Sequence, residues 1–474
     1  MPDGPRDMKI PRQARIGVLI AVSLAAGIAG NWLWRHHLRP QPQVQVAHWR
    51  FTPEDRILVL APHPDDEVLG CAGVIQAARA AGLPVRIVYF TYGDNNEWAF
   101  LLYRRHPVLT PAAMRAMGEI RHGEALAAGR ILGLSTNDQI FLGYPDFGTL
   151  QIWNQHWGAA PPHRSMLTRV AAVPYADAFR PGAPYKGEEI VADLKTIFRD
   201  FKPTRVFVSH PADHHSDHRA LYLFTRVALW ELAGEMQPEV QPYLVHFKGW
   251  PRPLAYRPDA GLFPPAFFGD QIVWHGYALT PSEVETKHRA LMAHASEVKA
   301  TPALLAFVRR NELFGDFSAI QTARGFSAGA QESFDQPAEE QEFLTAEERA
   351  RFVGIEERMI GVEDGCLAVR VRLSRPLARA VELSIQAFGY RPDRPFEEMP
   401  KIHVELGELT TRVLDQNREL PAGRIAVTRR GREVFVKIPL AELGGPDRIL
   451  TRVRAYLGDV PLDWVAWREI DLPP

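Results

Sequence analysis

The feature that most constrains this chain is an alternation of short apolar runs with helix-periodic segments between residues 55 and 250. Short apolar runs bounded by polar residues are typical of buried strands, and the segments between them repeat apolar residues at helical spacing. This alternation predicts an α/β fold with a mostly parallel, Rossmann-like sheet covered by helices on both faces. The expected strands span residues 56–61, 84–90, 138–143, 204–209 and 243–247. The expected helices follow the first strand to about residue 81 and span residues 117–134, 187–201, 217–232 and 280–296.

From about residue 355 the apolar pattern changes to a period of two, as in "LAVRVRL" (367–373) and "VELSIQA" (381–387). Alternating runs with hairpin patterns around Gly431 and within residues 456–467 predict a small all-β domain, sandwich-like in architecture. We therefore expect five consecutive parts: an N-terminal segment (1–38), a linker (39–54), the α/β domain (55–318), a second linker (319–354) and the all-β domain (355–474).

Residues 16–34 contain no charged residue and are just long enough to span a bilayer as a helix. Lys9, Arg12 and Arg15 precede them, which favours a cytoplasmic N-terminus and an exported body. We expect a membrane anchor with the remaining domains outside the cytoplasm. A cleaved export signal, with a processing site at residues 27–29, and a buried helix are the alternatives.

The charge balance and the cysteines add two exclusions. The chain has 55 Lys and Arg against 56 Asp and Glu, which gives no indication of a nucleic-acid partner. The only two cysteines, Cys71 and Cys366, fall in different expected domains, so we expect no disulfide framework. The oligomeric state is not predicted by any of these features.

Two long loops, residues 94–112 and 144–186, follow the second and third expected strands. Loops of this length in compact domains are usually functional. The second loop carries four aromatic residues that could stack on a substrate or could instead pack the loop against the domain: Trp153, Trp157, Tyr175 and Tyr185.

Polar clusters directly follow the first and fourth expected strands. "PHPDDE" places His63, Asp65 and Asp66 after the first strand, and "HPADHHSDH" (210–218) follows the fourth. Because the carboxyl ends of parallel strands meet at one edge of a sheet, where ligands bind in such folds, the two clusters are expected to lie close together.

The spacing of His63 and Asp66 places both side chains on one side of a first helical turn. An imidazole and a carboxylate suit zinc or another divalent ion, and the second cluster offers a histidine as third ligand, which leaves one position open for water. Asp65 would then be placed to accept a proton from that water. A plainer interpretation is that these acids are favoured at a helix start and that the histidines form a solvated loop. It does not explain why His63 ends a strand.

Together the two clusters resemble those of the PIG-L/LmbE-like N-acetylglucosaminyl de-N-acetylases, a zinc-dependent family. The resemblance covers about residues 55–315 and includes further segments in the same order. These segments are "TYGDN" (91–95), "GEIRHGEALAAGRILGL" (118–134), "FLGYPD" (141–146) and "ETKHRALMAHAS" (285–296). Ser216 stands where the family usually has proline.

The resemblance implies a role for each residue of the two clusters. Zinc would be bound by His63, Asp66 and His218, and Asp65 would be the general base on the zinc-bound water. His215 would protonate the leaving amine or stabilise the tetrahedral oxyanion.

Four residues around these are given supporting roles. The resemblance implies that Asp217 orients a histidine. It also places Arg121 and Asp146 at positions that are near the substrate in the family. Glu67, the third acid of the first cluster, is expected to support the helix start or to lie just outside the ligands.

The expected activity is therefore zinc-dependent removal of an N-acetyl group from an amino-sugar-containing substrate, either a glycan or a glycolipid. An amidase acting on another acylated small molecule or on a thiol conjugate is the alternative within the same chemistry. A membrane-anchored glycan-binding protein is the alternative of another class, although binding alone needs no general base such as Asp65. The all-β domain could bind a glycan or partner, or could be a structural cap.

Overall fold

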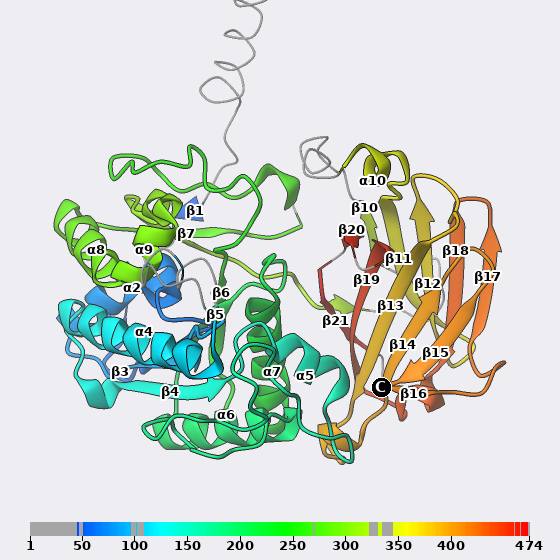
Figure 1. The fold of residues 1–474 in the computed structure, drawn as a ribbon, viewed down its shortest axis with the longest axis horizontal. Coiled ribbons are helices and arrows are strands. Elements are labelled where there is room, and N and C mark those ends of the chain that lie inside the picture. Colours follow the sequence, from blue (N-terminus) through cyan, green and yellow to red (C-terminus); the bar gives the residue numbers. More distant parts are fainter. Residues whose placement is uncertain are drawn as a thin grey trace, which may run out of the picture. The chain divides into compact units, whose positions relative to one another are not determined.

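The computed structural model describes residues 45–46, 51–95, 101, 109–268, 271–321, 330–333, 345–458, 460–464 and 466–472 (Figure 1). Within these ranges no helix is both long and apolar enough to cross a membrane. The predicted anchor at residues 16–34 lies outside the described residues. The predicted domain boundaries stay predictions, and the expected linker 319–354 includes three short elements. These are β9 (Ile320–Gln321), β10 (Ala330–Ser333) and α10 (Ala346–Ala350).

The first part of the chain forms the predicted mostly parallel sheet with helices. Its strand order is β1-β7-β8-β6-β5-β2-β3-β4, and β6, β5, β2, β3 and β4 are mutually parallel. These five strands are β2 (Ile57–Ala61), β3 (Val85–Thr91), β4 (Gln139–Tyr144), β5 (Arg205–Ser209) and β6 (Glu239–Tyr243). The helices around them are α2 (Asp66–Ala80), α4 (Pro111–Ile131), α5 (Thr149–Gln155), α6 (Gly187–Phe201), α7 (Ser216–Glu231), α8 (Pro281–Ala293) and α9 (Ala295–Ala300). The α/β prediction is confirmed.

The sheet edge beyond β6 was not predicted. β8 (Asn311–Phe314) pairs antiparallel with both β6 and β7 (His275–Ala278), and β1 (Gln45–Val46) pairs with β7. The predicted fifth strand, residues 243–247, was also wrong, since β6 ends at Tyr243. The apolar residues Leu244 and Val245 are buried, but the N–H of Val245 donates to the Asp213 carboxylate at 3.1 Å instead of to a strand.

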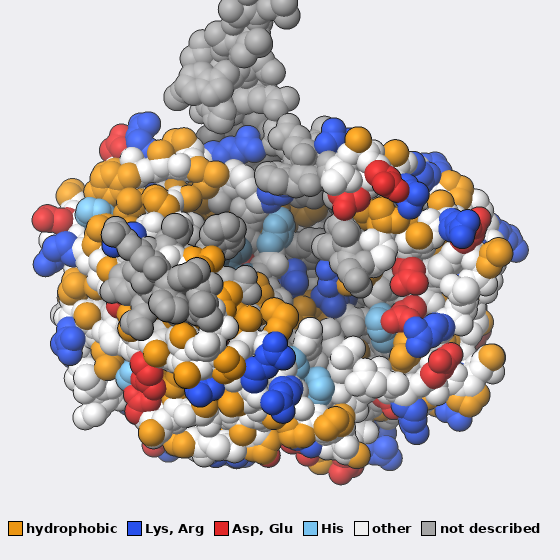
Figure 2. All heavy atoms as spheres, in the orientation of Figure 1, with side chains coloured by type: hydrophobic (Ala, Val, Ile, Leu, Met, Phe, Trp, Pro, Cys, Tyr) orange, Lys and Arg blue, Asp and Glu red, His pale blue; other side chains and the backbone are white. Residues whose placement is uncertain are grey.

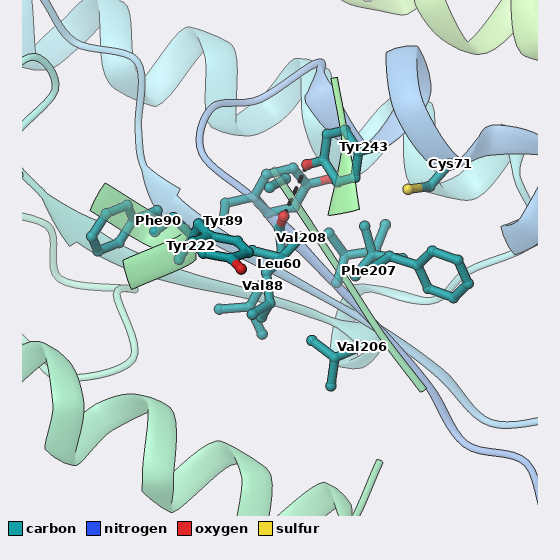
Figure 3. Packing of buried hydrophobic residues seen from close by; sticks show 14 of the residues in the cluster. Leu60, Cys71, Val88, Tyr89, Phe90, Val206, Phe207, Val208, Tyr222 and Tyr243 are labelled. Atoms are coloured by element: carbon teal, nitrogen blue, oxygen red, sulfur yellow. Dashed lines mark hydrogen bonds between the residues drawn. The ribbon is translucent and has the colours of Figure 1, made fainter. Parts of the chain in front are cut away.

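The sheet and α2 pack closely enough to fix the turn between β2 and α2. All five residues of β2 are fully buried, and the Tyr243 hydroxyl donates to the Leu60 carbonyl at 2.9 Å across the sheet (Figure 3). Gly70 of α2 lies against the Tyr243 ring, where a Cβ would overlap the ring atoms. The start of α2 is therefore held against the carboxyl ends of the central strands.

The C-terminal part forms two sheets around a second hydrophobic core, as predicted. One sheet has the order β10-β11-β12-β18-β17, and the other has the order β16-β15-β14-β13-β19-β21-β9. Their strands are β11 (Ile355–Glu363), β12 (Cys366–Leu373), β13 (Val381–Tyr390), β14 (Lys401–Leu406), β15 (Thr411–Asp415), β16 (Arg418–Glu419), β17 (Ala426–Arg430), β18 (Glu433–Pro439), β19 (Arg448–Leu457), β20 (Val460–Trp464) and β21 (Arg468–Asp471). Gly431 and Gly458, with φ of 59° and 57°, form the two expected hairpin turns.

An aromatic cluster joins the two parts. Trp153 of α5 is fully buried and packs on Phe388, Phe396 and Trp467 of the C-terminal part, with ring centroids 5.4–6.1 Å apart. Trp157 adds a ring contact with Phe396 at 5.0 Å. These two aromatic residues therefore pack the 144–186 loop against the C-terminal part.

The other two aromatic residues of that loop pack against the first part of the chain. Tyr175 stacks on Tyr92 with ring centroids 3.7 Å apart, and the Tyr185 hydroxyl donates to the Gly143 carbonyl at 3.4 Å. Both rings are buried, so packing rather than an exposed stacking face accounts for the four aromatic residues.

We expect Trp153→Ala to lower the free energy of unfolding by about 3–5 kcal/mol, because it leaves a cavity among rings from both parts of the chain. Urea unfolding followed by tryptophan fluorescence and circular dichroism measures the change. Met166→Ala is the control, because Met166 is 65% exposed and its truncation should change stability by less than about 0.5 kcal/mol. If Trp153→Ala lowers the free energy of unfolding by less than about 1 kcal/mol, this aromatic cluster does not hold the two parts together.

Candidate metal and catalytic site

The turn from β2 into α2 carries the first predicted cluster. The backbone N–H of His63 donates to Asp66 Oδ2 at 2.9 Å, and His63 Nδ1 lies 3.2 Å from the same oxygen. Between them Asp65 precedes the helix with φ 129° and ψ −28°, a backbone conformation that favours glycine. A non-glycine residue held there is strained, and such strain is concentrated at functional sites.

The turn from β5 into α7 carries the second cluster. His215 is the residue before α7, and its Nδ1 accepts the backbone N–H of Asp217 at 3.3 Å. His218 lies in the first turn of α7 and is fully buried. Asp213, in the loop before the helix, accepts the backbone N–H groups of His215 and His246 at 2.8 and 2.9 Å. That carboxylate therefore fixes the shape of the loop.

One carboxylate joins the two turns. Asp66 Oδ2 lies 3.2 Å from His63 Nδ1 and 3.1 Å from His218 Nε2. The second carboxylate oxygen of Asp66 is buried without a hydrogen-bond partner in the described part of the chain, and each ring nitrogen of His218 lies 3.1 Å from a carboxylate oxygen. Buried polar atoms are normally paired, so an unpaired carboxylate oxygen beside two imidazoles suits a cation. The predicted ligands His63, Asp66 and His218 are thus brought together.

Two further groupings share these residues. One ring nitrogen from each of His63, His215 and His218 lies within 4.8 Å of the other two. A carboxylate oxygen of Asp66 and one ring nitrogen from each of His218 and His246 also lie within 4.8 Å of one another. His246 was not predicted as a site residue. It lies three residues beyond the end of β6, at the same sheet edge, and its place within an expected strand concealed it.

The histidines and carboxylates shift one another's pKa values in the direction expected of a negatively charged site. Burial opposes protonation of His218, but the carboxylates of Asp213 and Asp66 outweigh it and raise its pKa to about 9. Burial would raise the pKa of Asp66, but the His218 and His63 imidazoles hold it well below its usual range. A divalent cation would balance the same negative charge that these protons balance. The donor set therefore fits a metal ion such as zinc.

The second ring nitrogen of His63, Nε2, contacts two carboxylates. His63 Nε2 lies 3.2 Å from Asp217 Oδ2 and 3.2 Å from Asp146 Oδ1. Asp217 in turn accepts the backbone N–H of Phe147 at 2.6 Å and the Thr149 hydroxyl, so it connects α7 to the loop after β4. Asp217 therefore contacts a histidine as the predicted orienting role requires, and the role itself stays a prediction.

Asp146 stands beside His63 within the site. The substrate contact of Asp146 stays a prediction. Its carboxylate contacts His63, and its Oδ2 accepts the backbone N–H of Asn95 at 2.9 Å. Asp146 also belongs to a grouping with His63, His215 and Asp217 whose atoms lie within 4.8 Å of one another.

Asp65 lies beside the ligands in a buried and acidic environment. Burial and the negative charge of Asp66 raise the pKa of the Asp65 carboxyl well above its usual range, against the lowering effect of Arg121. A carboxylate with a raised pKa holds an abstracted proton more firmly, which suits a general base. Arg121 Nη2 is 3.8 Å from Asp65 Oδ2.

Arg121 is buried and hydrogen-bonds to the backbone of this turn. It donates to the carbonyls of Pro64 and Gly93 at 2.9 and 3.0 Å, and it lies 3.2 Å from Glu297. Its predicted contact with substrate is untested, but its hydrogen bonds are to the protein backbone. Arg121 therefore holds the strained turn in place.

Glu67 connects the same turn to the distant C-terminal end of α8. Its Oε2 accepts the backbone N–H of Asp65 and its Oε1 lies 2.9 Å from His294 Nε2. His294 is fully buried, and its pKa is raised by the carboxylates of Glu67 and Asp65, against the effect of burial. Glu67 thus contacts the backbone of Asp65 and the ring of His294, and its supporting role stays a prediction.

Three residues around the site were not predicted from the sequence. They are Asp213, His246 and His294. Asp213 belongs to the second cluster and lies 3.1 Å from His218 Nδ1, a contact that the sequence spacing alone did not reveal. His214, the extra histidine of that cluster, packs on Phe247 with ring centroids 4.7 Å apart and belongs to none of the metal groupings.

Comparisons with known proteins find one family model and several relatives that resemble this chain. Residues 58–229 match the family model described as GlcNAc-PI de-N-acetylase (PIG-L). A 1D-myo-inositol 2-acetamido-2-deoxy-alpha-D-glucopyranoside deacetylase from Streptomyces avermitilis is 29% identical over 43% of this chain, and the alignment spans 64% of that relative, just under two thirds. A deacetylase of the same description from Rhodococcus opacus is 25% identical over 55% of this chain and 87% of its own length. Among solved structures, N,N'-diacetylchitobiose deacetylase from Pyrococcus horikoshii is 20% identical over 57% of this chain and 79% of that chain, with a TM-score of 0.32.

We expect Asp65→Gly to be more stable than Asp65→Asn by about 1 kcal/mol or more, because both remove the carboxylate but only glycine relieves the strained φ. Paired urea unfolding of the two variants measures the difference. The comparison cancels the loss of the contact with Arg121, which both variants share. Equal stability, or a less stable Asp65→Gly, would show that the turn stores no strain at this residue.

Proposed function

Since residues 58–229 are a PIG-L family domain, we propose that the protein is a zinc-dependent hydrolase that removes an N-acetyl group from an amino-sugar-containing glycan or glycolipid. The observation that carries this proposal is the Asp66 carboxylate between His63 and His218, with Asp65 beside it. The relatives from Streptomyces and Rhodococcus are described as deacetylases of an acetamido sugar, which supports the same substrate class.

Zinc fits the proposed ligands His63, Asp66 and His218, and when bound it would polarise the amide carbonyl and lower the pKa of a water molecule. Asp213 and Asp217 keep the two histidines in place, since each contacts a ring nitrogen at 3.1–3.2 Å. Carboxylates beside ligand histidines fix ring orientation and raise ligand basicity.

Asp65 would accept the proton of the attacking water. Its position is fixed by the helix start and by the hydrogen bond from its own backbone N–H to Glu67 at 2.9 Å. The raised pKa of its carboxyl favours retention of that proton until it is passed to the leaving nitrogen.

His215 would stabilise the oxyanion or donate a proton to the leaving nitrogen. Burial, together with the positive charge of His63, holds the pKa of His215 well below its usual range. Its ring is therefore neutral at pH 7, and because Nδ1 accepts the Asp217 N–H, the proton resides on Nε2. A neutral Nε2–H can donate to negative charge that develops in the transition state.

Two other functions use the same residues differently. An amidase acting on another acylated small molecule or a thiol conjugate would share all of these groups, and substrate profiling separates it from the sugar deacetylase. A glycan-binding protein would not need a buried carboxylate at Asp65 in a strained conformation, so the strain favours the enzyme.

Asp65→Asn should retain bound zinc while kcat for acetate release falls by about 10²–10⁴-fold, because the base is lost but the ligands remain. His218→Ala should lose zinc. Metal content by plasma mass spectrometry and acetate release from N-acetylated sugars measure both effects.

His214→Ala is the matched control, since His214 lies in the same loop outside the metal groupings, and we expect it to keep both zinc and activity. Wild-type rates in Asp65→Asn would rule out Asp65 as the base. Stoichiometric zinc in His218→Ala would rule out His218 as a ligand.

We further propose that residues 16–34 anchor the protein with its catalytic domain outside the cytoplasm, from their lack of charge and the preceding basic residues. The expected result is a carbonate-resistant membrane fraction and a C-terminal tag that added protease cleaves in intact spheroplasts. A tag that protease reaches only after lysis would contradict this orientation.

A further inference from the structure

β19 presents a row of cationic side chains on one face. Alternate residues Ile449, Val453 and Ala455 are buried in the second hydrophobic core, as a period of two requires. The other face carries five residues, which are Arg448, Leu450, Arg452, Arg454 and Tyr456. Leu450 belongs instead to the core of the first part.

This face runs along α7 toward the proposed active site. Arg448 lies over the ring of Trp230 at 5.3 Å, near the C-terminal end of α7, and Arg226 pairs with Glu469 of β21. At the other end of α7, burial and the positive charges of Arg454 and Arg219 lower the pKa of Arg452, so Arg219 lies within electrostatic reach of Arg452. Arg219 directly follows the proposed ligand His218.

Arg452 and Arg454 have no carboxylate partner in the part of the chain that the structure describes. Arg452 is almost fully buried, donates Nε–H to Gln386 Oε1 and lies over the Trp467 ring at 4.9 Å. Arg454 lies over the Tyr456 ring at 4.5 Å, and its Nε is buried without a hydrogen-bond partner.

Two acidic side chains described on β13 and β14 are engaged elsewhere or lie farther along. Glu405 of β14 pairs with Arg412 at 3.0 Å, and Glu382 of β13 stands opposite Tyr456 rather than opposite an arginine. Among the described residues, the charge of Arg452 and Arg454 is therefore offset by the Trp467 and Tyr456 rings and by the Gln386 amide oxygen, and by no carboxylate.

Such an arrangement is costly unless an anion completes it. Arg452 and Arg454 are alternate residues on one face of β19, and burial together with the charge of Arg454 holds the pKa of Arg452 well below its usual range. Uncompensated buried charges are strongly destabilising, whereas arginine forks bind carboxylate, sulfate and phosphate groups well.

We propose that Arg452 and Arg454, together with Arg219, form a subsite for an anionic group of the substrate. Figure 2 shows a hollow between the first and C-terminal parts, with Lys, Arg and His side chains gathered in it. The proposal deepens and rests on the proposed function, because it names the substrate as an amino sugar that carries a carboxylate, sulfate or phosphate.

Arg219 connects this subsite to the catalytic residues. Its Nη1 donates to the Asp213 carbonyl at 3.2 Å, and the Asp213 carboxylate lies 3.1 Å from His218 Nδ1. An anion that binds Arg219 therefore lies next to the loop that positions His218, a proposed zinc ligand. The sandwich then contributes to substrate selection as well as to stability.

The first experiment measures binding without catalysis. In metal-free protein, inorganic phosphate should raise the melting temperature of the wild type. Arg454→Gln should melt higher than the wild type in phosphate-free buffer, since repulsion is relieved, and should lose most of the response to phosphate. Arg448→Gln is the matched control on the same strand face, since Arg448 already pairs with Asp471 at 3.4 Å, and it should keep the response.

Three outcomes would overturn the subsite. One is a lower melting temperature of Arg454→Gln with an unchanged phosphate response, which would mean that the arginines only pack the interface. Another is a phosphate response that requires bound metal. The third is an equal loss of response in Arg448→Gln.

The second experiment compares kcat/KM for N,N'-diacetylchitobiose, N-acetylglucosamine 1-phosphate and an N-acetylglucosamine disaccharide that contains glucuronate. Arg454→Gln should lower kcat/KM by about tenfold or more for the charged substrates and leave the neutral one nearly unchanged. The two charged substrates separate phosphate from carboxylate recognition. Equal effects on all three would overturn the subsite. If no substrate is deacetylated while the phosphate response holds, the proposed function fails and the anion site stands.

Discussion

The contact on which the rest of the structure depends is that of one Asp66 oxygen with His63 and His218 at 3.2 and 3.1 Å. The two histidines come from turns that are 155 residues apart in sequence, and they meet only because β2 and β5 are adjacent parallel strands. The close packing of Gly70 on Tyr243 brings the start of α2 to that edge. The strained Asp65 follows from the same constraint, because the chain must turn sharply from the strand end into the helix.

The proposed ligands and the base could be predicted from sequence because strand ends are marked locally. An apolar run that stops before His63 and another that stops before the His210–His218 cluster are enough, given parallel strands, to place both clusters at one edge. The supporting contacts could not be predicted in this way. Glu67 reaches His294, 227 residues away, and Arg121 reaches the Pro64 and Gly93 carbonyls, so neither partner is visible in spacing.

The edge of the sheet shows a second limit of the sequence pattern. An apolar run at residues 243–247 was interpreted as a strand, but burial and strand pairing are different requirements. Leu244 and Val245 are buried by packing, while the Asp213 carboxylate takes the backbone N–H groups of Val245 and His246 that a strand partner would otherwise take. The misplacement hid His246, whose position beyond the strand end is what brings it to Asp66 and His218.

The C-terminal sandwich need not be either a structural cap or a binding module, because one sheet face can serve both purposes in different places. Toward the C-terminal end of α7 that face places Phe388 and Leu450 in the first hydrophobic core, and its arginine, Arg448, pairs with Asp471 at 3.4 Å. Farther along β19 it carries Arg452 and Arg454, which have no carboxylate partner among the described residues. A purely structural interface would gain stability from apolar residues along its whole length. The change from apolar residues and a paired arginine to arginines without a carboxylate partner therefore falls where function, rather than packing, sets the choice of residue.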